Sequence, residues 1–403
     1  MLSRVRFLAV VVALAIAAPM SWRTASAADV QGVTPNSILI GVQVALTGPA
    51  STVGQGFRAG IDMAVDEINA HGGINGRTIK TVYEDDSGTA EGGILAVRRL
   101  IEQDQVFAVM GGGTSTSTVS VIPLVQQGGV VYYDSLASDP RVLETYSPYV
   151  FSGMTIVRAD IANSIIAALK KDLKAKTVGI VTSDEALCTA AVTLIEPQFQ
   201  ANGLKLVVDQ KFRSGDTDFS TQAAAVKAAN PDALYMCGLP IDGGRLIPQL
   251  KRAGVTSKLL GDGTFTDANI IRVGGASIDG LYSFWIVSRQ FIGETSGPIA
   301  DWKERFARKF PNPPAGVPNH YTLAAYSDMY CLAEGIRRAG RDLTRDKLIA
   351  GLETLHDYVA GTDKAFSYAA AIGTPRTFRK GDHKGARTTQ LVVVRNGQFV
   401  AAH

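Results

Sequence analysis

The fold is decided by residues 37–76, which read SILIGVQVALTGPASTVGQGFRAGIDMAVDEINAHGGING. Residues 38–44 form a nearly continuous apolar run, which predicts a strand buried on both faces. The HGGING sequence at the end is rich in turn-forming residues. Between them, apolar side chains recur on one face of a helix at Phe57, Ile61, Ala64, Val65 and Ile68. A buried strand, an amphipathic helix and a turn form the unit that builds parallel sheets with helical crossovers.

The same unit recurs in two series along the chain. The first series continues with strands at 78–84, 106–110 and 130–133. The second series begins near Lys176, and its strands are expected at 177–182, 204–212, 233–237 and 258–260. Later helices are expected at 219–228, 245–253, 297–310, 321–339 and 345–355. A final hairpin with an Asn-Gly turn is expected at 390–400. We therefore predict an α/β protein with two doubly wound lobes and a helical portion added late.

The composition excludes several classes of protein. Of the 403 residues, 46% are hydrophobic and 19% are charged, which excludes a disordered chain and is ample for a packed core. The net charge of +3 comes from three arginines in the first 27 residues, because the remaining chain has 37 basic and 37 acidic residues. A neutral chain has no basic field for nucleic acid or an anionic membrane, so neither is expected as a partner.

Residues 1–27 have the three parts of a secretory signal peptide. Arg4 and Arg6 are positively charged, and residues 7–18 form an apolar run too short to span a bilayer. The sequence ASA at 25–27 supplies the small residues of a cleavage site. We expect cleavage before Ala28 and export to the periplasm. No cysteine follows the expected cleavage site, so a lipid anchor is not expected.

Three cysteines, Cys188, Cys237 and Cys331, allow at most one internal disulfide. Cys237 ends a predicted strand and Cys188 lies just past another, and loops at the carboxyl ends of neighbouring parallel strands approach each other. A Cys188–Cys237 disulfide is one interpretation, and two buried thiols are the other. Cys331, on an apolar helix, is expected to stay a free thiol. The cysteines and the five histidines lack metal-ligand spacing, so neither a metal nor a cofactor is expected.

Signatures of catalysis are missing from the sequence. There is no GxSxG sequence and no lysine after a glycine-rich phosphate loop, and the glycines within 54–60 do not have dinucleotide-binding spacing. A nucleophile at Ser115 would need a base, and no histidine lies near it in sequence. We interpret Asp85 and Asp86 as a solvated strand end rather than as paired catalytic carboxylates. We therefore expect a binding protein and not an enzyme.

Two loops rich in small hydroxyl residues follow neighbouring predicted strands. Residues 111–117 read GGGTSTS, and residues 135–140 read SLASDP. Ligands of open α/β sheets bind at the carboxyl ends of the strands, where a helix N-terminus favours an anion. The hydroxyls of Ser115 and Thr116 could hydrogen-bond a carboxylate, and helix capping is the alternative role for such residues. The occurrence of two such loops favours a carboxylate site.

These loops are part of a longer series of sequences that resembles a known family. The series comprises IG at 40–41, LTGP at 46–49, INAHGGING at 68–76, EDD at 84–86, GGGTSTST at 111–118, SDP at 138–140, YTLAAY at 321–326 and GDHKG at 381–385. Over nearly all of the chain after the signal peptide, it resembles the periplasmic leucine/isoleucine/valine-binding proteins of ABC importers. The resemblance implies two α/β lobes that close on one small ligand around a hinge crossed three times. We expect residues 28–155 plus 282–354 to form the first lobe and residues 156–281 plus 355–403 to form the second.

The resemblance also implies where the ligand is held. Family members clamp the ligand's carboxylate with hydroxyls and backbone N–H groups of the first lobe, and these positions resemble Ser115, Ser138 and the backbone of Leu136. An acidic residue that holds the ligand's ammonium group falls near Asp262. The remaining walls of the implied pocket fall near Val53, Leu187, Leu239 and Tyr321.

This chain departs from the family at those walls. Amino-acid binders carry aromatic residues where this chain has Val53, Leu187 and Leu239, and Gly88 and Thr114 replace a cysteine pair of the first lobe. Burying an ammonium group beside leucines without a firm partner would cost several kcal/mol. The expected ligand is therefore a small carboxylate, either a branched-chain amino acid or a related aliphatic or aromatic acid without an amine.

The expected function follows from the resemblance and the signal peptide together. A monomeric periplasmic protein would deliver the ligand to the membrane permease of an ABC importer. The alternative is a ligand-sensing component that presents the ligand to a signalling partner, because the same lobes and the same export signal suit both roles.

Overall fold

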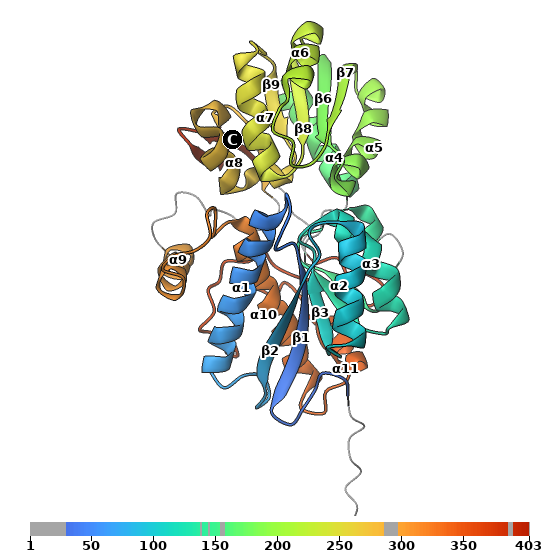
Figure 1. The fold of residues 1–403 in the computed structure, drawn as a ribbon, viewed down its shortest axis with the longest axis vertical. Coiled ribbons are helices and arrows are strands. Elements are labelled where there is room, and N and C mark those ends of the chain that lie inside the picture. The colour runs from blue at the N-terminus through green and yellow to red at the C-terminus, as the bar shows by residue number, and fades with distance from the viewer. Residues whose placement is uncertain are drawn as a thin grey trace, which may run out of the picture.

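The computed structural model describes residues 30–137, 139–143, 146–153, 158–285, 297–385 and 390–402. The chain forms two lobes that lie one above the other in Figure 1, each with a sheet flanked by helices. The sequence-based prediction of an α/β protein with two doubly wound lobes is confirmed. The expected signal peptide at 1–27 lies outside the described residues.

The first lobe, the lower one in Figure 1, contains a parallel sheet of five strands in the order β2-β1-β3-β4-β5. Its strands are β1 Ser37–Val44, β2 Thr78–Asp85, β3 Ala108–Gly111, β4 Val131–Asp134 and β5 Val150–Ser152. Its helices are α1 Ser51–Ala70, α2 Ala90–Glu102, α3 Ser115–Gln127, the short η1 Pro140–Val142, α9 Gly297–Lys309, α10 His320–Ala339 and α11 Arg345–Leu352. Because all neighbouring strands are parallel, the loops that follow them open at one edge of the sheet.

The second lobe contains a mixed sheet of seven strands in the order β12-β11-β10-β9-β8-β6-β7. Its strands are β6 Thr177–Ser183, β7 Lys205–Phe212, β8 Ala233–Cys237, β9 Lys258–Gly261, β10 Tyr282–Trp285, β11 Gln390–Arg395 and β12 Gln398–Ala401. Its helical segments are α4 Arg158–Ala167, η2 Ala168–Asp172, α5 Ala186–Ala201, α6 Ser220–Ala229, α7 Pro240–Arg252, η3 Gly263–Thr266, α8 Ala268–Gly274 and η4 Gly275–Ile278. Strands β11 and β12 form the hairpin expected at 390–400 and join antiparallel to β10.

Every strand predicted from apolar periodicity is present, with ends within two residues of the prediction. Strands β5 and β10, which are three and four residues long, were not predicted from the sequence. Such short segments carry too little alternation to be recognised, and lateral pairing with longer strands is what orders them. Helix α11 ends at Leu352, earlier than the expected 355.

The chain passes between the lobes three times. The three passages are flanked by the residue pairs Gly153/Arg158, Trp285/Gly297 and Gly385/Gln390. The segments between the members of each pair lie outside the described residues. Sheet membership places β10 with the second lobe, although the boundary expected at 282 assigned it to the first lobe. Likewise, residues 355–385 pack on the first lobe, although the expected boundary at 355 assigned them to the second.

The packing of residues 355–385 follows from buried polar and aromatic contacts. Arg376, fully buried, donates from its Nε to Asp328 of α10 at 3.0 Å. The ring of Phe378 packs edge-on against Phe151 at 5.3 Å between centroids, and Ser152 of β5 forms a parallel bridge with Lys384. An unpaired buried guanidinium is costly, so the Arg376–Asp328 pair ties this segment to the first lobe.

Helices α1 and α10 pack closely because of a glycine. A β-carbon at Gly60 of α1 would lie 2.1 Å from the carbonyl oxygen of Thr322, so only glycine allows this approach. Both helices bury apolar faces against the first-lobe sheet, with Phe57 and Tyr326 among the buried side chains. Within the described ranges, no helix combines the length and the apolar character needed to cross a membrane.

Candidate functional site

A pocket lies where the two lobes meet. Its lining comes from both lobes: Pro49, Thr52, Val53, Asn319 and Tyr321 from the first, and Leu239, Pro240, Ile241 and Asn269 from the second. The cavity volume of this partly open pocket is about 10 Å³, which is room for about one water molecule. A larger ligand would therefore have to widen this pocket. The structure brings together three of the expected wall residues here, namely Val53, Leu239 and Tyr321.

Apart from the residues that line this pocket, the first lobe meets the second at the N-terminus of α3, which with the loop that precedes it we call the first-lobe wall. Thr114 caps the helix, and its Oγ1 accepts a hydrogen bond from the backbone N–H of Ser117 at 3.4 Å. Ser115 is buried, and its Oγ accepts from the backbone N–H of Asp139 in the neighbouring loop at 3.3 Å. The loop and the helix thus place two hydroxyl residues, Ser115 and Thr116, at the positive end of the helix dipole.

The loop after β4 is held by a buried carboxyl group. Asp134 Oδ1 accepts from the backbone N–H of Ala137 at 2.9 Å, and Oδ2 accepts from the Ser152 hydroxyl at 2.6 Å. Burial raises the pKa of Asp134 to about 8, and the negative charge of Asp328 adds to the effect. Leu136, expected to offer its backbone to the ligand, is buried in this loop. Ser138, the other expected clamp residue, lies outside the described residues.

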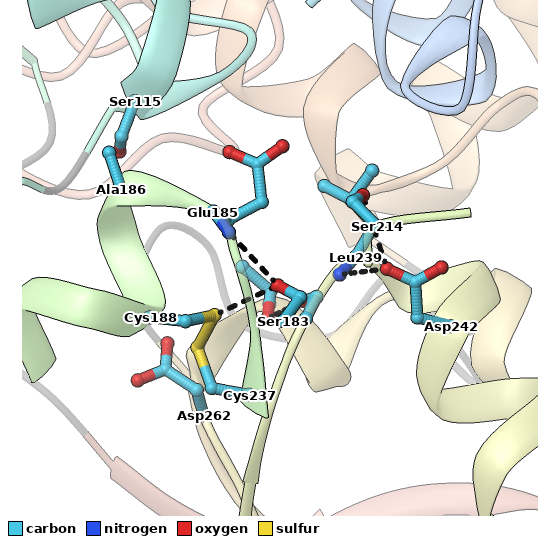
Figure 2. The surroundings of a disulfide bond; sticks show 12 residues. Ser115, Ser183, Glu185, Ala186, Cys188, Ser214, Cys237, Leu239, Asp242 and Asp262 are labelled. Atoms are coloured by element: carbon cyan, nitrogen blue, oxygen red, sulfur yellow. Dashed lines mark hydrogen bonds between the residues drawn. A yellow bond between two sulfur atoms is a disulfide. The ribbon is translucent and has the colours of Figure 1, made fainter. Parts of the chain in front are cut away.

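A disulfide between Cys188 and Cys237 holds the second-lobe wall (Figure 2). It joins the first turn of α5 to the last residue of β8, with Cα atoms 5.5 Å apart. The interpretation of Cys188 and Cys237 as a disulfide is therefore confirmed, as is the free, buried thiol of Cys331. Leu187, an expected wall residue, is buried next to Cys188, and the lining of the small pocket does not include it.

Glu185 connects the two walls. It directly precedes α5, and its Oε2 accepts a hydrogen bond from the Thr116 hydroxyl of the first lobe at 2.8 Å. The backbone N–H of Ala186 donates to the same Thr116 oxygen at 3.3 Å. Burial raises the pKa of Glu185 to about 7. The hydrogen bond from Thr116 opposes this rise, and the negative charges of Asp184, Asp242 and Asp86 add to it.

Glu185 is not among the site residues predicted from the sequence. Its signal was present, because Asp184 and Glu185 directly follow a predicted strand at the edge where ligands bind. The acidic residue predicted from the family resemblance is instead Asp262, which is fully buried. Its Oδ2 accepts from the Tyr235 hydroxyl at 2.7 Å, and in Figure 2 its carboxyl group lies on the opposite side of the disulfide from Glu185.

Tyr321 stands at the N-terminus of α10 and faces acidic groups of the second lobe. Burial raises its pKa well above the ordinary value, and the charges of Asp267, Glu185 and Asp262 contribute. Its neighbour His320 makes a second contact between the lobes, with Nδ1 2.9 Å from Asp267 Oδ2. The second-lobe side of the cleft is therefore acidic around Tyr321.

The interpretation of Asp85 and Asp86 as a solvated strand end is wrong for Asp86. Asp86 is buried and accepts from Gln43 Nε2 and from the backbone N–H of Gly88, both at 2.8 Å. Asp85 accepts from the backbone N–H of Leu46 at 2.8 Å. Both carboxylates therefore hold the loops that flank the cleft. No set of three or more potential metal ligands is gathered anywhere in the described part of the chain.

Two α/β lobes that meet at a small pocket, and that also touch where the N-terminus of α3 faces the Glu185 carboxylate, define a two-lobed ligand-binding protein. A family described as "Periplasmic binding protein" matches residues 37–398. The chain therefore belongs to the periplasmic binding protein family, and the predicted relationship to the leucine/isoleucine/valine-binding proteins is confirmed.

Relatives of known name support the same placement. An "Amino acid binding protein" of Pseudomonas aeruginosa is 26% identical over 335 residues, which cover 82% of this chain and 84% of that protein. The "Leu/Ile/Val-binding protein BraC3" of Rhizobium johnstonii is 28% identical over 305 residues, which cover 75% and 80%.

Solved structures show the same fold at low identity. A substrate-binding periplasmic protein from Ralstonia solanacearum superposes with a TM-score of 0.77 at 20% identity, covering 90% of this chain and 99% of that one. The substrate-binding protein LivJ of a branched-chain amino acid transporter from Streptococcus pneumoniae, in complex with isoleucine, gives a TM-score of 0.75 at 21% identity and covers 91% and 98%. At such identities, these two structures support the fold alone.

Proposed function

We propose that this protein binds a small carboxylate-bearing ligand between its lobes and delivers it to the membrane permease of an ABC importer. In this role it acts as a monomer in the periplasm, after its signal peptide is removed, and catalyses no reaction. The proposed ligand is an amino acid or a related aliphatic or aromatic acid, in keeping with relatives that are named for binding amino acids.

The observation that carries the proposal is the first-lobe wall. The α3 N-terminus places Ser115 and Thr116 where the lobes meet, and Thr116 already touches the second lobe through Glu185. A helix N-terminus with adjacent hydroxyls stabilises a carboxylate through its dipole and through charge-assisted hydrogen bonds. A ligand bound there would contact both lobes, so its binding would favour the closed arrangement.

The experiment is calorimetric titration of the chain from Ala28 onward with leucine, phenylalanine and their deaminated acids. Hydrogen bonds to charged groups contribute roughly 1.5–3 kcal/mol each, so Ser115→Ala is expected to weaken binding about ten- to hundredfold. Ser138→Ala is expected to do the same if the second loop completes the clamp.

The matched control is Ser120→Ala, which removes a hydroxyl from the same helix. Ser120 Oγ donates to the carbonyl oxygens of Ser117 and Ala90, away from the helix N-terminus. This variant should bind with wild-type affinity. Unchanged affinity in Ser115→Ala would remove that residue from the site, and binding of none of the four compounds by the wild type would contradict the proposed function.

A further inference from the structure

We propose that the two lobes carry a latch of their own, a direct polar contact that stabilises the closed arrangement with or without a ligand. The latch consists of Gly316 and His320 in the first lobe and of Asp267 and Asn269 in the second. This inference goes beyond the proposed function, in which ligand binding favours closure. It predicts that the lobes are mostly closed before any ligand arrives.

Asp267 is the centre of the latch. It directly precedes helix α8 and is 0% exposed. Its Oδ2 accepts a hydrogen bond from the backbone N–H of His320 at 3.2 Å, and His320 Nδ1 lies 2.9 Å from the same oxygen. Hydrogen bonds to an ionised acceptor are about twice as strong as those between neutral groups. The first lobe therefore supplies donors to a carboxylate that belongs to the second lobe.

Asn269 adds a second bond between the lobes. Its Nδ2 donates to the carbonyl oxygen of Gly316 at 3.1 Å, and its side chain is almost fully buried. Two contacts within the second lobe orient this amide: Nδ2 also donates to Asp267 Oδ1 at 2.7 Å, and Oδ1 accepts from Arg272 Nε at 3.0 Å. Because these two contacts do not involve the first lobe, closure costs little side-chain entropy at Asn269.

Asn319 fixes the first-lobe half of the latch. This buried residue caps α10, and its Oδ1 accepts from the backbone N–H of Thr322 at 3.1 Å. Its Nδ2 donates to the carbonyl oxygens of Gly316 and of Thr52 in α1, both at 3.1 Å. The chain on either side of Asn319 is therefore tied to helices α1 and α10. Both halves of the latch are thus held in place by contacts within their own lobes.

The latch borders the pocket between the lobes. Asn269 and Asn319 both line that pocket, together with Tyr321. The bonds of the latch join protein atoms directly, so their free energy favours closure in the free protein as well as in the ligand-bound protein. The populations of two conformations follow from such differences in contacts. A ligand must therefore wait for the latch to open before it enters, and again before it leaves.

Small-angle scattering of the chain from Ala28 onward measures closure without a ligand. Unfolding in urea, dialysis and refolding remove any ligand carried through purification, and we expect the wild type to keep the radius of gyration of the closed structure. Asp267→Asn is the first variant, because asparagine keeps the Oδ1 that caps α8 and places an amide donor where Oδ2 accepts. It should lower the ratio of closed to open protein about ten- to hundredfold and so raise the radius of gyration.

Gly316→Ala should break the other bond of the latch. An added β-carbon would lie 2.0 Å from Asn269 Oδ1, so the lobes could not approach as they do now. The control is Gly340→Ala, because Gly340 has the same φ of +82° and nothing within 4 Å of an added β-carbon. The two variants therefore bear similar backbone strain. Only Gly316→Ala should raise the radius of gyration, and combining it with Asp267→Asn should raise it further.

Two results would overturn the latch. One is a wild type that is expanded in the absence of ligand, a measurement that needs no variant to fold. The other is a wild-type radius of gyration in Asp267→Asn, in Gly316→Ala and in their combination, with each variant folded by circular dichroism. Neither result depends on which ligand binds. If none of the compounds in the calorimetric titration binds, the proposed function fails, whereas the latch is decided by scattering alone.

Discussion

The two walls of the cleft share one local topology and are held in place by different means. Each wall consists of loops that follow neighbouring parallel strands, β3 and β4 in the first lobe and β6 and β8 in the second. In the first lobe the buried carboxyl group of Asp134 organises the wall through hydrogen bonds. In the second lobe the covalent bond between Cys188 and Cys237 does so.

Because the two walls are held by different interactions, they should respond to different conditions. A wall held by a carboxyl group with a raised pKa should depend on pH, because the charged and neutral forms differ in stability. A wall held by a disulfide should depend on the redox environment. Substitutions can disrupt each wall separately.

Removing the disulfide should have the largest effect. The two cysteines are 49 residues apart in sequence, and loss of a native disulfide typically costs about 2–5 kcal/mol. We expect Cys188→Ala combined with Cys237→Ala to lower the free energy of unfolding by that amount in urea titrations. Cys331→Ala, which deletes a buried free thiol, is the control and should cost less. Three free thiols in denatured, unreduced wild type would contradict the bridge.

Gly112→Ala should break the first wall. Gly112 has a φ of +99°, and an added β-carbon would lie 2.0 Å from Asp134 Oδ1, so the substitution strains the backbone and displaces the carboxyl group. We expect a loss of about 1–3 kcal/mol from the backbone alone, together with loss of ligand binding.

The control for this substitution is Gly72→Ala. Gly72 has a similarly positive φ of +92° and nothing within 4 Å of an added β-carbon. The Gly72→Ala variant therefore shows the effect of backbone strain alone, without a clash of the added β-carbon. Its affinity for the ligand should equal that of the wild type. Equal stability and equal affinity in both variants would show that the contact with Asp134 is unimportant.

Asp134→Asn should change the pH dependence of stability by a smaller amount. The folded-state pKa of about 8 lies above the unfolded value of about 3.9, so the folded protein holds an extra proton between them. Stability should therefore fall as pH rises from about 4 to about 8, by at most about 1.4 kcal/mol per pH unit for this group. Glu185 and Asp242, with pKa values raised to about 7 and about 6, act in the same direction.

Asparagine resembles the neutral carboxyl group, so the variant should lose the share of the slope that belongs to Asp134. Urea titrations between pH 5 and pH 8 measure that slope. Asp301→Asn, on the exposed face of α9, is the control and should keep the wild-type slope. An unchanged slope in Asp134→Asn would mean that this carboxyl group is ionised in the folded protein.

Much of the fold was predictable because its signals are local. The run at 38–44 and the helical face through Phe57 and Ile68 specify a buried strand and its crossover helix without reference to any other part of the chain. The hydroxyl loop with Ser115 was predictable for the same reason. The disulfide was predictable only as one of two possibilities, since it required a distance between two strand ends.

Periodicity and turn chemistry act within a few residues. They therefore specify the succession of strands and helices, the two lobes, and the hydroxyl-rich N-terminus of α3. The three-dimensional fold, in contrast, was needed to show that Asp262 accepts a hydrogen bond from Tyr235 and that Glu185 reaches Thr116 across the lobes. It also decided that Asp86 is buried and that residues 355–385 pack on the first lobe. These outcomes depend on which distant side chains meet. The residues next to a carboxylate in the sequence do not show whether folding leaves it in water or buries it against a partner.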